Sequence, residues 1–257
     1  MSLSIIVPAW NHWQTTANCL ASIFKSKILI PYKVIVINDN STDYTAKLLQ
    51  TIGQEGYPIT LLTNDENKGY LGSTNMALKI VNSTYILFLN NDVILDKNCI
   101  KELIEVYRQH PDIGILGATQ LDVNRNELYP LKFFLRGEKA TIRDHIIATN
   151  IPENLREADV AYCDDVHFAC SLTTKEVIDK IGGQLDPDFG LGNYDQESAC
   201  CAVKEQGYQI AVAPRAKFVH LCSVSVRDKI SEYSLLLDKN RELFFKKWGQ
   251  KLKENKI

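Results

Sequence analysis

The sequence lacks a hydrophobic run long enough to cross a membrane, because no apolar stretch approaches the 18 or so residues that a spanning helix needs. It also lacks a basic segment ahead of its first apolar stretch, "SIIVP" (4–8), and a cleavage site behind it. We therefore expect neither a transmembrane segment nor a signal peptide. We predict a cytoplasmic location, and the inner face of the membrane is the second location that we consider.

The sequence has no excess of either charge and no closely paired cysteines. Its 29 Lys and Arg and 31 Asp and Glu give a net charge of −2, which does not indicate a nucleic-acid partner. The cysteines number seven, and no C-x-x-C pair occurs. Since Cys163, Cys170, Cys200, Cys201 and Cys222 lie in apolar or mixed segments, we expect reduced, buried thiols and no disulfide framework.

Two phosphate-binding signatures are absent as well. No G-x-G-x-x-G follows the first apolar stretch, and no G-x-x-x-x-G-K-[ST] occurs anywhere. These absences argue against a dinucleotide fold of the usual kind and exclude a P-loop. A phosphorylated ligand would need another neutralising group, and a divalent cation held by one or two carboxylates is a suitable one.

The 257 residues are 45% apolar and 23% charged, which is typical of a globular protein, and the first half alternates strand and helix patterns. Strands alternating with helices predict right-handed crossovers and an α/β fold with a mainly parallel central sheet flanked by helices. The predicted strands are 4–8, 32–39, 59–65, 84–92 and 112–121, and the predicted helices are 14–26, 41–52, 71–81 and 98–109.

The alternation stops at residue 122 and resumes near residue 167. We interpret 122–160 as loops or a flap, and strand and helix patterns return in 167–183 and 198–214. A C-terminal helix over 231–249 is predicted to pack back on the domain. Its apolar face comprises Tyr233, Leu236, Leu237, Asn240, Phe244 and Trp248. The alternative is that the basic end of this helix contacts a membrane surface peripherally. The basic residues there are Lys246, Lys247, Lys251 and Lys253.

Polar clusters follow the first four predicted strands, at 8–11, 38–41, 64–69 and 90–92. Each cluster alone is also typical of a turn or a helix cap. In an open parallel sheet, however, ligands bind beyond the carboxyl ends of the strands. Four clusters at one edge predict a polar groove, in which Asp92 is placed to hold a cation.

At these segments the sequence resembles a known family. "SIIVPAWNH", "VIVINDNSTD", "NKGYLGSTNMALK" and "LFLNNDVIL" resemble the successive motifs of family 2 glycosyltransferases with the GT-A fold. "IGGQLDPDFG" and "GNYDQESACCAVKEQGYQIAVAPRAKFVHLCSVS" resemble the acceptor-side and metal-binding region of that family. The resemblance covers roughly residues 3–226 and implies one Rossmann-like GT-A domain over 1–257. It places a nucleotide-binding half at about 1–120, an acceptor and metal half at about 121–226, and a C-terminal helix at about 227–257.

The resemblance also implies which residues form the site and which ligands they bind. The donor would be a UDP-, dTDP- or GDP-sugar, the cofactor Mn²⁺ or Mg²⁺, and the acceptor a glycan or a lipid-linked molecule. Asp39 would bind the base and ribose, and Asn90-Asn91-Asp92 stands where the family has its metal-binding D-x-D. The implied nucleotide-binding residues are Pro8, Ala9, Trp10, Asn11, Asp39, Asn67, Lys68, Gly69 and Asn91, and the implied metal ligands are Asp92 and His220.

At the position of the catalytic base, the sequence departs from the family. An inverting transfer needs a carboxylate that takes the proton of the acceptor hydroxyl. The family usually has Glu-Asp where this sequence has Asp195-Gln196, and a glutamine cannot act as a base. Three interpretations stay open: Asp195 is the base, Glu197 is the base, or the protein is a nucleotide-sugar-binding pseudoenzyme or non-catalytic subunit. A sugar nucleotidyltransferase fits less well, because its Gly-rich N-terminal loop with a basic residue is missing.

Donor and acceptor specificity is expected in the loops at about 122–165 and 184–197. Basic residues in the first of these loops favour either an anionic or lipid-phosphate acceptor or a solvated basic face. They are Lys132, Arg136, Lys139 and Arg143.

Overall fold

The computed structural model describes residues 1–121, 129–130, 147–148, 158–221, 230–254 and 257, and in 129–130, 147–148 and 230–234 it describes the backbone alone. Most of the predicted loop or flap at 122–160 lies outside these residues. So do Cys222 and the four basic residues Lys132, Arg136, Lys139 and Arg143.

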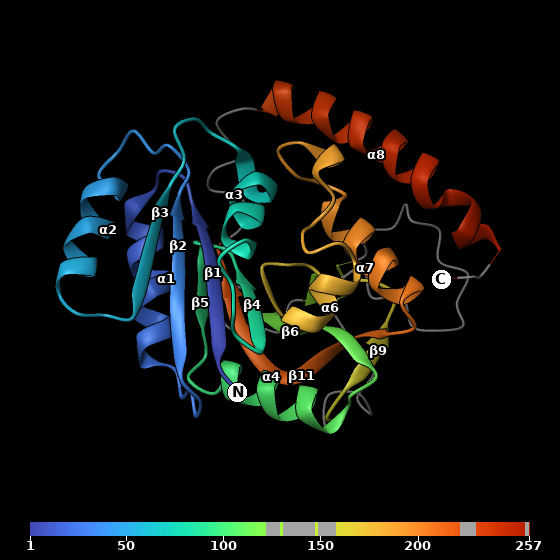
Figure 1. The fold of residues 1–257 in the computed structure, drawn as a ribbon, viewed down its shortest axis with the longest axis horizontal. Helices are drawn as coiled ribbons and strands as arrows, with labels where there is room; N and C mark the ends of the chain where they lie inside the picture. Colours follow the sequence, from blue (N-terminus) through green and yellow to red (C-terminus); the bar gives the residue numbers. More distant parts are fainter. Residues whose placement is uncertain (122–128, 131–146, 149–157, 222–229, 255–256) are drawn as a thin grey trace.

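The first half of the chain forms the parallel part of the central sheet (Figure 1). Its four strands run in the order β3-β2-β1-β4, and every neighbouring pair among them is parallel. β1, β2 and β4 are apolar runs that are buried on both faces at their centres, as expected of a covered parallel sheet, whereas β3 lies at the edge of the sheet and is only half-buried. The strands are β1 (Leu3–Ala9), β2 (Tyr32–Asn38), β3 (Ile59–Thr63) and β4 (Tyr85–Leu89).

The second half extends this sheet with strands of both directions. β10 (Cys170–Thr174) lies antiparallel between β4 and β6 (Ile113–Leu121), and β11 (Gln209–His220) runs parallel to β6. β5 (Val93–Leu95) and β9 (Ala161–Cys163) both pair antiparallel with β11. The predicted α/β fold is confirmed, and the sheet is mixed once the second half is included. A separate short pair joins β7 (Tyr129–Pro130) and β8 (Ile147–Ala148).

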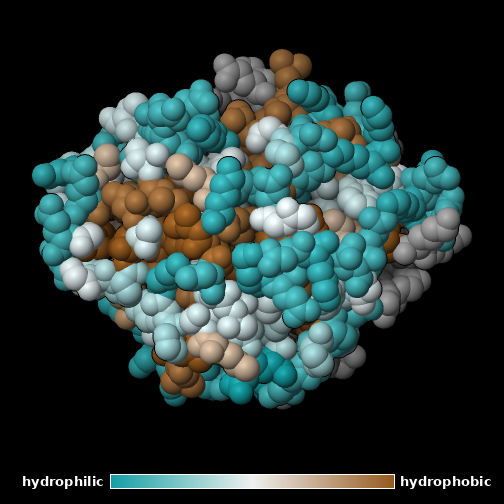
Figure 2. All heavy atoms as spheres, in the orientation of Figure 1, coloured by the Kyte–Doolittle hydropathy of each residue, from teal (hydrophilic) through white to brown (hydrophobic). Residues whose placement is uncertain are grey.

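Helices cover both faces of the sheet, and each face has its own hydrophobic core. Alternate residues of β2 show the division, because Val34 and Val36 belong to one core and Ile35 and Ile37 to the other. The first core includes residues of α1 (Trp13–Lys25), α2 (Thr45–Gln54) and α4 (Cys99–Gln109). The second includes residues of α3 (Gly69–Leu78), α6 (Lys175–Lys180), α7 (Asp195–Glu205) and α8 (Ile230–Lys253), together with the short 3-10 helix η1 (Pro187–Phe189). On the face shown in Figure 2, hydrophobic side chains gather over β1–β3 beside α3.

α8 packs across the second core with the face that the sequence predicts. Asn240, Phe244 and Trp248 are buried, and Leu236 and Leu237 are half-buried. No helix in the described part of the chain is both long and apolar enough to span a membrane.

Two of the four lysines considered for membrane contact bind acidic residues of the same chain. Lys247 forms ion pairs with Asp186 at 2.5 Å and Asp188 at 2.6 Å, and Lys251 pairs with Glu205. These pairs hold α8 against η1 and α7, whereas Lys246 and Lys253 are exposed.

The cysteines have the predicted character. Cys19, Cys99, Cys163, Cys170, Cys200 and Cys201 are unoxidised and buried. The prediction of reduced, buried thiols is confirmed for these six residues.

Candidate active site

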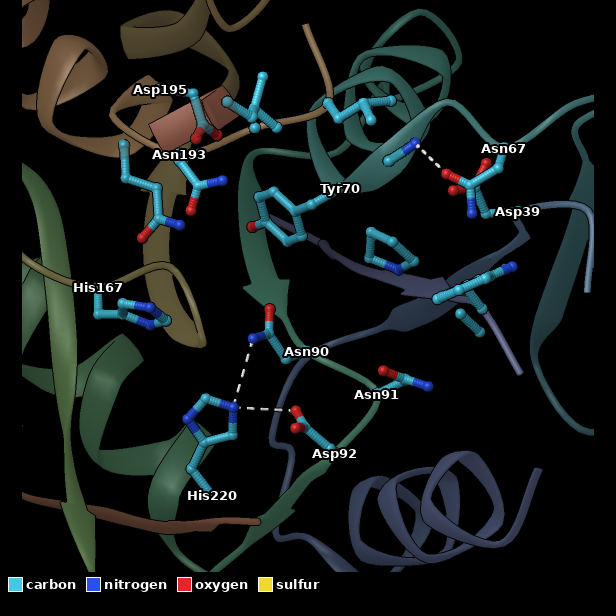
Figure 3. Close-up of a pocket in the computed structure, with 18 of the residues that line it drawn as sticks. Asp39, Asn67, Tyr70, Asn90, Asn91, Asp92, His167, Asn193, Asp195 and His220 are labelled. Carbon is cyan, nitrogen blue, oxygen red and sulfur yellow. Dashed lines mark hydrogen bonds and ion pairs between the residues drawn. The ribbon is translucent and has the colours of Figure 1, made fainter. Parts of the chain in front are cut away.

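A cavity of about 690 Å³ lies at the carboxyl ends of β1, β2 and β4, where the polar clusters were predicted to meet (Figure 3). The start of α3, the segment before α7 and the N-terminal half of α8 complete its walls. The predicted site residues that line it are Pro8, Ala9, Trp10, Asp39, Asn67, Gly69, Asn91, Asp92, Asp195 and His220. Asn11, Lys68 and Glu197 are not among the lining residues.

Asp39 lies at one end of the cavity and is 3% exposed. Its Oδ1 accepts hydrogen bonds from the Asn64 amide at 2.7 Å and from the Lys68 backbone N–H at 2.8 Å. Asn64 is itself bound to Ser73 at 2.9 Å, so the carboxylate is held in one orientation. A carboxylate has about four acceptor positions, so Asp39 retains capacity for N–H or O–H groups of a ligand.

Asn11 holds the two loops that bring Trp10 and Asp39 to the cavity. The Asn11 backbone N–H donates to Ser41 Oγ at 2.9 Å, and the Asn11 side-chain oxygen accepts from the Thr42 N–H at 2.8 Å. Asn11 has a φ of 54°, a left-handed conformation that Asn tolerates better than most residues. Its position therefore fits a supporting role for the loops that follow β1 and β2.

Asp92 and His220 meet at the floor of the cavity (Figure 3). Antiparallel pairing of β5 with β11 places His220 opposite Val93, and Asp92 Oδ1 lies 2.9 Å from His220 Nε2. Asn90 Nδ2 lies 3.5 Å from the same nitrogen. The floor of the cavity thus combines a carboxylate oxygen, an imidazole nitrogen and a neutral amide.

This donor set fits a divalent cation with phosphate oxygens as its remaining ligands. Asp92 Oδ1 and His220 Nε2 contact each other directly at 2.9 Å, so the two atoms are close enough for both to contact one ion placed beside them. No group of three His, Cys, Asp or Glu side chains suited to a metal occurs among the described residues. A cation at this place would therefore need phosphate oxygens of a bound nucleotide for part of its coordination.

Two side chains of α1 form hydrogen bonds with the segment Asn90-Asn91-Asp92. Asn91 donates its amide N–H to Thr16 Oγ1 at 2.9 Å, and the Cys19 thiol donates to the Asn90 carbonyl at 3.4 Å. Burial, with the nearby Asp92 charge, raises the pKa of Cys19 far above its usual value, so this thiol stays a neutral donor. The turn between β4 and β5 is thereby fixed to α1.

Asp195 lies on the side of the cavity opposite Asp39 (Figure 3). It is the first residue of α7 and is 0% exposed. Tyr70 lies between the two ends, with its hydroxyl 3.4 Å from the Phe168 carbonyl. Burial and the negative charge of Asp195 raise the pKa of Tyr70, so its phenol stays protonated.

Gln196 uses its side chain to connect α7 with the segment before β10. Its Oε1 accepts a hydrogen bond from the Phe168 backbone N–H at 2.8 Å. Glu197, one residue further along α7, is half-buried and does not line the cavity. Of the carboxylates considered as the base, Asp195 is the one at the cavity wall.

His167 lines the cavity and was not predicted from the sequence. Its Nδ1 accepts the Ala169 backbone N–H at 3.0 Å, so the neutral ring carries its proton on Nε2 and donates from there. A single histidine before a strand gives no sequence signal of its own. The other lining residues that the sequence did not assign to a site are Tyr70, Leu191, Gly192, Asn193, Leu235, Leu236 and Lys239.

Comparison with known proteins gives a family match over most of the chain. The model of Glycosyl transferase family 2 matches residues 4–180. The uncharacterized glycosyltransferase YfnE of Bacillus subtilis (strain 168) is 25% identical over 117 residues, which are 46% of this chain and 30% of that protein. Poly-beta-1,6-N-acetyl-D-glucosamine synthase of Staphylococcus aureus (strain COL) is 26% identical over 126 residues, 49% of this chain and 30% of that protein. The matched part thus spans less than a third of each of these relatives.

Solved structures share the fold at low sequence identity. The mannosyltransferase PcManGT of Pyrobaculum calidifontis, in complex with GDP-Man and Mn²⁺, has a TM-score of 0.64 and 16% identity over 87% of this chain and 58% of its own. S. aureus TarS 1–349 in complex with UDP-GlcNAc has a TM-score of 0.62 and 16% identity over 85% and 58%. GalNAc-T7 with UDP, GalNAc and Mn²⁺ has a TM-score of 0.67 and 13% identity over 86% and 44%. These matches confirm the predicted GT-A fold.

Proposed function

Because the chain belongs to glycosyl transferase family 2, we propose that it transfers a sugar from a nucleotide-diphosphate sugar to an acceptor hydroxyl. One observation carries the proposal. A single cavity has Asp39 at one end, Asp195 at the other, and the Asp92–His220 pair on its floor. Along the cavity, these three groups follow the order in which the nucleobase, the diphosphate and the acceptor would lie during such a transfer.

The Asp39 end is the proposed nucleotide site. The carboxylate is oriented by Asn64 and the Lys68 backbone, and it accepts N–H or O–H groups of the base and ribose. Pro8, Ala9 and Trp10 line the same cavity and are proposed to contact the nucleotide, and Asn67 and Gly69 are proposed to border the diphosphate. GDP-Man and UDP-GlcNAc occupy structures with this fold, so UDP-, GDP- and dTDP-sugars are the donors to test.

Asp92 and His220 are the proposed ligands of a Mn²⁺ or Mg²⁺ ion. When bound, the ion supplies positive charge that stabilises the nucleotide diphosphate as a leaving group. Asn90 lies beside His220 and helps to orient its ring, and Asn91 fixes the turn to α1.

Asp195 is the proposed general base, and inversion at the sugar is the proposed stereochemical course. Burial keeps the pKa of Tyr70 raised, and His167 Nδ1 is already occupied by the Ala169 N–H, which leaves Asp195 as the best placed of the three to accept a proton. Gly192 lies beside this carboxylate, since a Cβ built on it would be in van der Waals contact with Asp195 Oδ1 at 3.6 Å. The acceptor hydroxyl is proposed to approach Asp195 from the cavity that both residues line.

The proposed acceptor is a glycan or a lipid-linked molecule. The α8 end of the cavity carries Leu191, which is 51% exposed, Leu235, which is 74% exposed, and the cation Lys239. Exposed leucines beside a cation suit an acceptor that has both apolar and anionic parts. One of the relatives is a poly-beta-1,6-N-acetyl-D-glucosamine synthase. We therefore propose surface or cell-wall polysaccharide synthesis as the process, and the cytoplasm as the location.

The test is transfer and donor hydrolysis with a panel of UDP-, GDP- and dTDP-sugars in the presence of Mn²⁺. We expect turnover for at least one donor, and Asp195→Asn should lower kcat by about 10²–10⁴-fold, the range for loss of a general base. Affinity for the nucleoside diphosphate should stay close to that of the wild type, because Asp195 lies away from the Asp39 end. Glu197→Gln is the matched control and should retain activity. Full activity of Asp195→Asn together with loss in Glu197→Gln would reassign the base.

A nucleotide-sugar-binding protein without transferase activity is the second candidate. Gln196 stands where the family has its acid, and the structure shows its side chain bound to the Phe168 backbone. Binding of a nucleotide sugar without turnover of any donor would support this candidate and overturn the enzyme proposal.

A further inference from the structure

The segment before α7 has a strained backbone. Gly190, Gly192, Asn193 and Tyr194 all have positive φ, at 61°, 122°, 71° and 62°. For residues other than glycine, this conformation costs of the order of 1 kcal/mol each and persists only where the surroundings enforce it. Residues 191–193 line the cavity, and so does Asp195, which follows after Tyr194. The shape of the acceptor side thus depends on whatever holds this segment.

Asn240 of α8 holds it through three backbone carbonyls. The amide nitrogen donates to Phe189 O at 2.8 Å, Gly192 O at 2.7 Å and Asn193 O at 3.1 Å. Asn240 is 1% exposed, and its Oδ1 has no hydrogen-bond partner among the described residues. One amide has two N–H groups, so the three carbonyls share two hydrogens. The carbonyls of Phe189, Gly192 and Asn193 therefore share this one buried amide as a donor, although its own oxygen has no partner among the described residues.

α3 closes the same segment from the other side. A Cβ on Gly69 would come within 2.3 Å of the Leu191 carbonyl oxygen, so the two backbones are in close contact. α8 lies along the outer side of this region (Figure 1), and Trp248 Nε1 donates to Ser198 Oγ in the first turns of α7 at 2.9 Å. The segment 189–194 is therefore enclosed between the start of α3 and α8.

From these contacts we infer that Asn240 is a positioning residue, which sets the conformation of 189–194 and through it the placement of Asn193 and Asp195. The inference rests on the proposed function for its effect on transfer. α8 then has two roles at the site, since its Leu236 and Lys239 also form part of the cavity wall. Asn240 itself does not line the cavity, so it acts through the segment that it binds.

Asn240→Leu removes the donors at nearly constant volume. We expect hydrogen exchange at the backbone amides of 189–198 to rise about tenfold or more, while the amides of β1–β4 keep their wild-type rates. kcat should fall about tenfold or more with the KM of the donor within about twofold. The Kd of whichever of UDP, GDP and dTDP binds the wild type most tightly, with Mn²⁺ present, should also stay within about twofold.

Two further variants separate this role from general loss of stability. Leu103→Ala in α4 lies in the core on the opposite face of the sheet, and it should lower Tm without raising exchange selectively at 189–198. Asn240→Asp keeps the shape but presents a carboxylate to three carbonyls. Burial raises the pKa of such a carboxyl, and the protonated form donates again, so the difference in Tm from the wild type should narrow as pH falls from about 8 to about 5.

Unchanged exchange at 189–198 in Asn240→Leu, or changes in exchange and kcat equal to those of Leu103→Ala, would overturn the inference. If the wild type turns over no donor, the proposed function fails. The exchange pattern and the Tm of Asn240→Asp then still decide whether Asn240 sets this segment.

Discussion

At the scale of single residues, Gln196 shows how a side chain at the position where the resemblance implies an acid can serve the fold. It lies in the first turn of α7, and its Oε1 accepts the Phe168 N–H at 2.8 Å. This bond attaches the helix that carries Asp195 to the segment just before β10. The amide thereby contributes to the placement of the neighbouring carboxylate.

We predict that Gln196→Leu lowers the free energy of unfolding by about 1–3 kcal/mol, because it leaves the Phe168 N–H without its acceptor. Gln196→Glu keeps an acceptor oxygen and should cost less. Urea unfolding at neutral pH measures both values. Equal stability of the Leu variant and the wild type would show that the hydrogen bond contributes nothing.

Residues at strand ends could be predicted, and residues supplied by other segments could not. Asp39 and Asp92 follow buried strands, and the geometry of a parallel sheet brings such positions to one edge. Tyr70 and His167 have no comparable signal, since an aromatic residue in a helix and a histidine before a strand are common core residues. The choice between Asp195 and Glu197 depends on the rotation of α7 about its axis, which the spacing alone does not determine.

At the scale of elements, the proposed metal site is a product of strand pairing. Asp92 follows β4 and His220 ends β11, and β5 joins them by pairing antiparallel with β11. The Leu221 N–H also donates to the Asp92 carbonyl at 3.0 Å. The two ligands are 128 positions apart in sequence but adjacent at one edge of the sheet.

We predict that Asp92→Ala and His220→Ala each weaken Mn²⁺ binding about tenfold or more in the presence of the preferred nucleoside diphosphate. Without the nucleotide, the wild type itself should bind Mn²⁺ weakly, because the phosphates are expected to complete the coordination. The difference in Mn²⁺ affinity between the wild type and each variant should then be smaller. Calorimetric titration with Mn²⁺ measures both. Asp65→Asn is the control, because this carboxylate is 89% exposed and pairs with Lys68 outside the cavity. Unchanged Mn²⁺ affinity in both alanine variants would place the ion elsewhere.

Several elements of the first half were predicted to within one residue, although the helix predicted over 41–52 is α2 at Thr45–Gln54 and the helix predicted over 71–81 is α3 at Gly69–Leu78. The helix predicted over 98–109 is α4 at Cys99–Gln109, and the strand predicted over 112–121 is β6 at Ile113–Leu121. Both carry strong periodic or continuous apolar patterns. β5 and β9 have three residues each and exist through their pairing with β11, so no local pattern announces them.

At the scale of the whole molecule, two cores on opposite faces of one sheet bury the described cysteines. Cys19, Cys99 and Cys170 belong to the core on the α1 and α4 side, and Cys200 and Cys201 to the core on the α7 side. Burial raises the pKa of Cys170 and Cys200 well above the usual value and that of Cys201 to about 12. Cys19 and Cys163 are shifted in the same direction for the same reason.

These shifts predict a loss of stability in mild alkali. An unfolded thiol has a pKa of about 8.5, so above that pH the unfolded chain releases protons that the native protein keeps. The native state then binds more protons, and the free energy of unfolding falls as pH rises, on the order of 1 kcal/mol per buried thiol by pH 9.5. Thermal or urea unfolding between pH 7.5 and about 9.5 measures the slope. Cys200→Ala should reduce it by the share of one thiol, after its own cavity cost is measured at pH 7.5. A free energy of unfolding that stays constant over this range, or a Cys200→Ala slope equal to that of the wild type, would mean that the thiols ionise as readily in the folded protein as in the unfolded chain.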